Sequence, residues 1–274
     1  MKHNLSSVAG FPLSFDDESL AVVTDPGFAF AVKQQLAGGM RAVLATPDAV
    51  PADTEVYRTY LPRMFPSDAT AALERLELTY SLVAVRPGRV GREFNKTRGH
   101  LHAILPGTSL TSPEVYAQLS GHLTLLLQRA SAAGNGIIDD FIAHELDPGS
   151  MVVIPPGYAH ALANPHQEPA LLAGLYGNPI RYPPRYEAIS RFGGFAYRVV
   201  SDGRGGSAFE PNPRYASVPP PGALRSPPDG LFAAPNPLDP LWASFLRSPD
   251  AYAFLSGADA ARARFGRSGA LVRR

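Results

Sequence analysis

Three histidines and one glutamate stand at positions where a folded chain could gather them around a metal ion. His100 and His102 are two residues apart, so in an extended strand both imidazoles point to the same face. Glu114 shares a face with Tyr116 in a second segment, and His160 follows in a third. Inward-pointing positions of several strands converge when a sheet curls into a barrel. The sequence therefore predicts a site of three imidazoles and one carboxylate for a divalent cation.

The composition of the chain limits which metal ligands and which kinds of binding partner are expected. The 274 residues include no cysteine, which excludes disulfides and thiolate sites and leaves nitrogen and oxygen donors. The formal net charge of +1 gives no sign of a surface for nucleic acid or anionic lipid, and the basic segment 262–274 is expected to be a solvated helix end and terminus. No apolar run approaches the roughly 18 residues of a membrane span, so a cytoplasmic, soluble protein is expected.

Short apolar or alternating runs between glycine and proline dominate the middle of the chain. They predict strands at 78–85, 101–105, 115–119, 123–128, 151–154, 158–163 and 170–176. Regular spacing of this kind favours an antiparallel barrel or jelly roll. Helical stretches are expected at 26–36 and 68–76, a further strand at 195–200, and two closing helices that begin near 241 and 249.

Two spacings then identify a family resemblance. Gly149, Pro155, Gly157, His160 and Asn164 reproduce the second motif of the cupin superfamily, and Glu114 with Gly121 reproduces the end of the first. Within the cupins, the segment 88–102, which ends in Lys-Thr-Arg-Gly-His-Leu-His, resembles the cupin-type (archaeal-type) glucose-6-phosphate isomerases.

The resemblance implies a mainly β fold, with a single cupin jelly-roll barrel at 76–200. An N-terminal extension at 1–75 would pack on the barrel, and 201–274 would supply a proline-rich segment and C-terminal helices that also pack on it. The expected assembly is a homodimer.

The resemblance also implies a metal centre and a substrate. The implied metal ligands are His100, His102, Glu114 and His160, holding one divalent ion per chain, iron(II) first and manganese, nickel or zinc as alternatives. The implied substrate is a sugar phosphate. Its binding residues would be Thr97, the backbone of Gly99, Tyr116 and Tyr176, with Lys96 or Arg98 as a nearby positive charge.

Three departures from the family pattern concern the substrate side. Eleven residues separate His102 from Glu114 where the family has about six, so 106–110 is expected to be an inserted loop at the cavity mouth. Val83 stands where the family commonly has a threonine hydroxyl. A tyrosine expected after Tyr176 is displaced, with Tyr182 and Tyr186 nearby.

The function implied is interconversion of glucose 6-phosphate and fructose 6-phosphate, an activity of glycolysis and gluconeogenesis. Glu114 is the candidate base that would move a proton between C1 and C2 through an enediol. A carboxylate bound to a cation is less basic, so a hydride shift stays open as a second route. A cupin iron(II) dioxygenase and a non-catalytic sugar-binding cupin are the alternatives. The remaining histidines, His3, His122, His144 and His166, are expected in turns or at the terminus, without a role.

Overall fold

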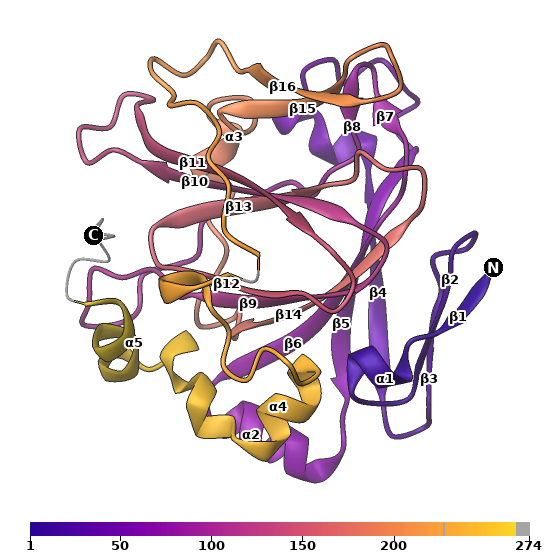
Figure 1. Cartoon of the computed structure of the whole chain (residues 1–274), viewed down its shortest axis with the longest axis vertical. Coiled ribbons are helices and arrows are strands. Elements are labelled where there is room, and N and C mark those ends of the chain that lie inside the picture. The colour runs from indigo at the N-terminus through magenta and orange to yellow at the C-terminus, as the bar shows by residue number, and fades with distance from the viewer. Residues whose placement is uncertain (227, 267–274) are drawn as a thin grey trace.

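The fold is mainly β, and antiparallel sheets form the jelly roll that the sequence predicts (Figure 1). The computed structural model describes residues 1–226 and 228–266. The basic segment after residue 266 therefore lies outside the described residues. Among those described, no helix is long and apolar enough to cross a membrane.

Six strands form the largest sheet, in the order β12-β9-β14-β6-β5-β4. Its members are β4 (Ala29–Leu36), β5 (Glu55–Met64), β6 (Leu78–Val85), β9 (Glu114–Ser120), β12 (Met151–Ile154) and β14 (Ala170–Gly177). A second sheet, in the order β11-β10-β13, consists of β10 (Leu123–Ala130), β11 (Ile138–Leu146) and β13 (Tyr158–Ala163). Buried side chains on nearly every residue of β9, β12, β13 and β14 show that these strands form the interior.

Two smaller sheets flank this core. One joins β1 (Lys2–Asn4), β2 (Leu13–Asp16) and β3 (Val22–Thr24), and the other joins β7 (Arg89–Val90), β8 (Glu93–Phe94), β15 (Tyr197–Ser201) and β16 (Ser207–Pro211). The helices are α1 (Ser6–Ala9), α2 (Ser67–Arg75), α3 (Glu187–Ser190), α4 (Leu241–Arg247) and α5 (Ala258–Phe265), with 3-10 helices η1 (Ala37–Val43), η2 (Gly230–Phe232) and η3 (Pro249–Leu255).

The C-terminal helices pack on the large sheet through aromatic side chains. Trp242 of α4 is buried, and its ring centroid lies 4.9 Å from those of Tyr80 and Phe65. In Figure 1 α2 and α4 appear at the bottom of the view, below β6, and α5 appears at the lower left. These aromatic contacts hold α4 against β6.

Two expectations about local structure were wrong. The segment 26–36 was expected to be helical, but its residues 29–36 form β4, because β5 offers a full antiparallel ladder that overrides local propensity. Residues 101–105 form no continuous strand; isolated bridges hold the chain there in an extended form.

The strands predicted at 78–85, 151–154 and 158–163 are confirmed. The division at residues 75 and 200 stays a prediction, and two strands from before residue 76, β4 and β5, belong to the large sheet.

Candidate metal centre

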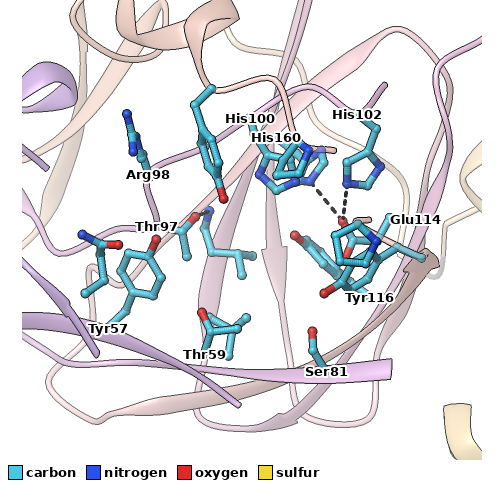
Figure 2. A pocket seen from close by; sticks show the side chains of 18 of the residues that line it. Tyr57, Thr59, Ser81, Thr97, Arg98, His100, His102, Glu114, Tyr116 and His160 are labelled. Carbon is cyan, nitrogen blue, oxygen red and sulfur yellow. Dashed lines mark hydrogen bonds and ion pairs between the residues drawn. The ribbon is translucent and has the colours of Figure 1, made fainter. Parts of the chain in front are cut away.

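The structure brings His100, His102, Glu114 and His160 together in one place. One ligand atom from each lies within 4.8 Å of the others. His100 is partly buried, and the other three are buried. Figure 2 shows the three imidazoles gathered above the Glu114 carboxylate.

Backbone hydrogen bonds position the ligands. The His100 N–H donates to the His160 carbonyl at 3.1 Å, and the His160 N–H donates to the His100 carbonyl at 2.9 Å. Glu114 begins β9, opposite Tyr176 of β14 and Ile154 of β12. A bridge thus joins His100 to His160, and strand pairing fixes Glu114, while His102 lies outside the named strands.

Contacts outside the cluster orient the rings. The Nδ1 atom of His102 lies 2.8 Å from the Ser112 carbonyl, to which it can only donate. The proton on Nδ1 leaves the Nε2 lone pair of His102 facing Glu114, 3.5 Å from its Oε2. This is the tautomer that a metal ligand needs.

Two buried atoms of the cluster fit a bound cation. Glu114 Oε2 and His160 Nε2 lie 3.1 Å apart, yet neither makes a hydrogen bond with acceptable geometry. A buried polar atom without a partner costs about 1–3 kcal/mol. A divalent cation between the two would satisfy both, so the donor set fits a metal.

Burial controls the charges of the four groups. It lowers the pKa of His102 and of His160 to about 4, and lowers the pKa of His100 well below its ordinary value, with a further contribution there from the other two imidazoles. Burial also raises the pKa of Glu114 to about 7, partly opposed by His102 and by a hydrogen bond with Tyr116. Near neutral pH the imidazoles are therefore uncharged donors.

The metal cluster lies at one end of a cavity of about 320 Å³, within the usual size of small-ligand sites. All four substrate-binding candidates line it. Thr97 accepts a hydrogen bond from the Leu162 N–H at 3.0 Å, which leaves its own hydroxyl proton available.

Gly99 has φ +75°, and a Cβ there would collide with the Phe195 ring, so packing alone already requires glycine. The Tyr116 and Tyr176 rings pack beside the imidazoles of His160 and His102, respectively.

Of the two suggested positive charges, only Arg98 lines the cavity. Lys96 is buried elsewhere: its ammonium lies 2.5 Å from Glu93 and 2.7 Å from the Val43 carbonyl. Of the two alternatives, Arg98 can therefore supply the expected positive charge in the cavity, and Lys96 cannot. Sequence position alone cannot show that a lysine is already paired.

The inserted loop does not sit at the cavity mouth, because none of residues 106–110 is among the lining residues. Leu110 is buried in the core instead, and Arg262 of α5 donates to the Gly107 carbonyl. The loop therefore supports the C-terminal helices, and the Arg262 side chain is bonded rather than fully solvated.

The other four histidines lie outside the cavity. His3 lies near the N-terminus, as expected, in β1, whereas His144, which was expected in a turn, lies in β11.

One supporting residue was missed. A Cβ on Gly174 of β14 would lie 2.7 Å from Glu114 Oε1, so only glycine leaves room for the carboxylate. The sequence did contain a signal for it, since an isolated glycine inside an apolar strand marks a place where another group approaches the backbone closely.

Known proteins resemble this chain over its central region. A family model described as glucose-6-phosphate isomerase matches residues 34–215. The glucose-6-phosphate isomerases of Pyrococcus furiosus and Thermococcus litoralis are 31% and 30% identical over 139 residues, which are 51% of this chain and 65% of each relative. The match thus spans just under two thirds of those relatives. A solved oxalate oxidase in complex with glycolate aligns at a TM-score of 0.29, with 15% identity, over 55% of this chain and 51% of that one.

Proposed function

The chain belongs to the glucose-6-phosphate isomerase family, since the family model covers well over half of it, and from this we propose a metal-dependent aldose–ketose isomerase. The proposed reaction interconverts glucose 6-phosphate and fructose 6-phosphate. The observation that carries the proposal is the buried cluster of three neutral imidazoles and Glu114 at the end of a small-ligand cavity.

His100, His102, Glu114 and His160 would hold the metal. Imidazole and carboxylate donors suit iron, manganese, nickel or zinc, and iron(II) is the ion we propose. When bound, a divalent ion polarises a substrate carbonyl and stabilises negative charge on neighbouring oxygens.

Glu114 is the proposed proton carrier between C1 and C2 of the sugar. Its carboxylate is the acidic group in the cavity lining, and Tyr116 hydrogen-bonds to it. Isomerisation in deuterium oxide distinguishes the two routes: proton transfer by Glu114 admits solvent deuterium to C1 or C2 of the product, and a hydride shift excludes it.

Thr97, Gly99, Tyr116 and Tyr176 are the proposed substrate-binding residues. Thr97 can donate its hydroxyl proton, and the two tyrosines place polar ends beside apolar ring faces at the cavity wall. We also propose a homodimer and a cytoplasmic location.

A coupled assay tests the function. Conversion of fructose 6-phosphate to glucose 6-phosphate should stop on chelation and return when iron, manganese, nickel or zinc is restored. His102→Ala should abolish both metal retention and turnover. His122→Ala is the matched control, because His122 pairs with Asp147 outside the cavity.

Two results would contradict the isomerase and favour one of the alternative functions. Oxygen uptake without sugar turnover would indicate the iron(II) dioxygenase. Sugar binding that chelation does not change, with no product under any metal, would indicate a binding protein.

A further inference from the structure

One wall of the cavity is an irregular segment, residues 178–186, rather than a strand. It lies between β14 and α3, outside the named strands. Four of its side chains line the cavity, those of Pro179, Tyr182, Pro184 and Tyr186. The residues between these four, apart from Asn178 at the start, are exposed to solvent. The wall is therefore one chain thick, and such a segment moves more easily than the strands around it.

This wall lies against the end of the cavity that holds the candidate metal ligands. The Arg185 N–H donates to the Leu101 carbonyl at 2.7 Å, and the Leu101 N–H donates to the Arg185 carbonyl at 3.4 Å. Leu101 stands between His100 and His102 in the chain. The ring centre of Tyr186 lies 5.6 Å from that of His100. The position of the wall therefore affects the space in which a substrate would meet the metal.

Glu77 holds the other end of the wall through three contacts. Its backbone carbonyl accepts a hydrogen bond from the Asn178 N–H at 2.8 Å. One oxygen of its carboxylate lies 2.8 Å from a guanidinium nitrogen of Arg181, and the other accepts from the Tyr182 hydroxyl at 2.9 Å. The carboxylate thus joins the turn after α2 to two neighbouring residues of the wall.

The hydrogen bond from Tyr182 should hold the wall more strongly than the ion pair with Arg181. The Arg181 side chain is 61% exposed, and an ion pair in contact with water contributes little. Tyr182 is buried, and its hydroxyl donates to a charged acceptor, which makes a strong hydrogen bond. Without Glu77, this hydroxyl would keep the longer contact to the Ser256 carbonyl, at 3.4 Å.

The backbone of Glu77 indicates that its side chain is needed. Glu77 has φ +52° and directly follows Leu76, the C-cap of α2. Glycine or asparagine is usual in this left-handed conformation, because a Cβ is disfavoured there. A residue in a disfavoured conformation persists where the surrounding contacts determine it. The contacts to the wall therefore explain a glutamate at a position where glycine would be less strained.

We infer that Glu77 is a positioning residue, which holds the wall 178–186 against the metal end of the cavity through the hydroxyl of Tyr182. Glu77 is not among the described residues that line the cavity, so it acts through Tyr182. The effect of the wall on a sugar phosphate rests on the proposed function. A wall that is already fixed spares substrate binding the cost of ordering Tyr182 and its neighbours.

Hydrogen–deuterium exchange on the metal-free full chain tests the positioning itself. The N–H groups of Arg181 and Tyr182 donate to the Asn178 carbonyl at 3.0 and 2.8 Å, so they are protected while the wall is in place. In Glu77→Gly, which permits the left-handed backbone and removes the carboxylate, they should exchange roughly tenfold faster than in wild type. Asn135→Gly is the matched control, because Asn135 has φ +55° and is exposed outside the cavity.

Steady-state kinetics with fructose 6-phosphate test the consequence for the reaction. Glu77→Gly and Tyr182→Phe should each raise the Michaelis constant by roughly three- to tenfold, the cost of ordering a side chain on binding, with kcat within about twofold of wild type. Glu77→Gln keeps an oxygen that can accept from Tyr182, and it should stay within about twofold of wild type in both constants. Arg181→Met should do the same, because its ion pair is exposed.

The outcomes separate this inference from the proposed function. Equal exchange of the wall in wild type and Glu77→Gly overturns the inference, whatever the activity. Faster exchange with an unchanged Michaelis constant in an active enzyme overturns it too, since the wall would then not act on the substrate. So does a Glu77→Gln variant as impaired as Glu77→Gly, because the Tyr182 hydrogen bond would then not be the link. Faster exchange in Glu77→Gly, without sugar turnover by wild type, supports the positioning and overturns the isomerase proposal.

Discussion

Replacing Glu114 by glutamine should stabilise the metal-free protein while it weakens metal binding. Burial raises the pKa of Glu114 from an ordinary value of 4.5 to about 7. The metal-free fold therefore loses stability from this group as pH rises from 4.5 to 7, because the unfolded chain releases the proton first. At about 1.4 kcal/mol per pKa unit, the loss reaches about 3 kcal/mol at pH 8. Glutamine has nearly the same shape and no such penalty.

Urea unfolding of the chelated proteins measures this difference. Glu114→Gln should exceed wild type by about 3 kcal/mol at pH 8 and by about 1.4 kcal/mol at pH 5.5, where less of the penalty has developed. With metal present the order should reverse, since a ligand that binds only the folded state stabilises it. A chelated Glu114→Gln protein that is no more stable than wild type at pH 8 would refute the reasoning.

Three other predictions concern the surroundings of the centre. Gly174→Ala should displace the Glu114 carboxylate and lower metal affinity by roughly 10- to 100-fold, measured by competition with a chelating dye; unchanged affinity would contradict the close approach. Trp242→Ala should lower the free energy of unfolding by about 3–5 kcal/mol in urea titrations, and a loss below 1 kcal/mol would show that the aromatic cluster contributes little. The chelated Glu114→Gln protein, which lacks the opposing contribution of Glu114, should lose stability as pH falls from 6.5 towards 4, because His102 and His160, with folded pKa values of about 4, take up protons mainly when unfolded; equal unfolding of this variant at pH 7 and pH 5 would argue against neutral imidazoles.

The sequence predicted that these four side chains come together, partly because strand alternation is a local rule. His100 and His102 face the same side even though no continuous strand forms there, since two bridges, at His100 and Leu101, keep the chain extended. The matching motifs also placed His160 and Glu114, whose strands β13 and β9 lie close to their predicted bounds.

What the sequence could not show depends on partners from distant segments. β4 was expected to be a helix because its own residues do not reveal the ladder with β5. The choice between Lys96 and Arg98 stayed open because the partners of Lys96, Glu93 and the Val43 carbonyl, are set by packing. The contacts of Glu77 with Arg181 and Tyr182 likewise join distant segments, and neither segment reveals them alone.

The hydrogen bonds of Ser112 connect the candidate metal centre to the C-terminal helices. Its carbonyl accepts from His102, while its hydroxyl donates to the Leu255 carbonyl at 2.7 Å. The residue that orients the His102 ring is thus held in place by η3, which lies outside the cavity. A substitution that loosens the packing of η3 should therefore turn the His102 ring and alter the candidate metal centre from a distance.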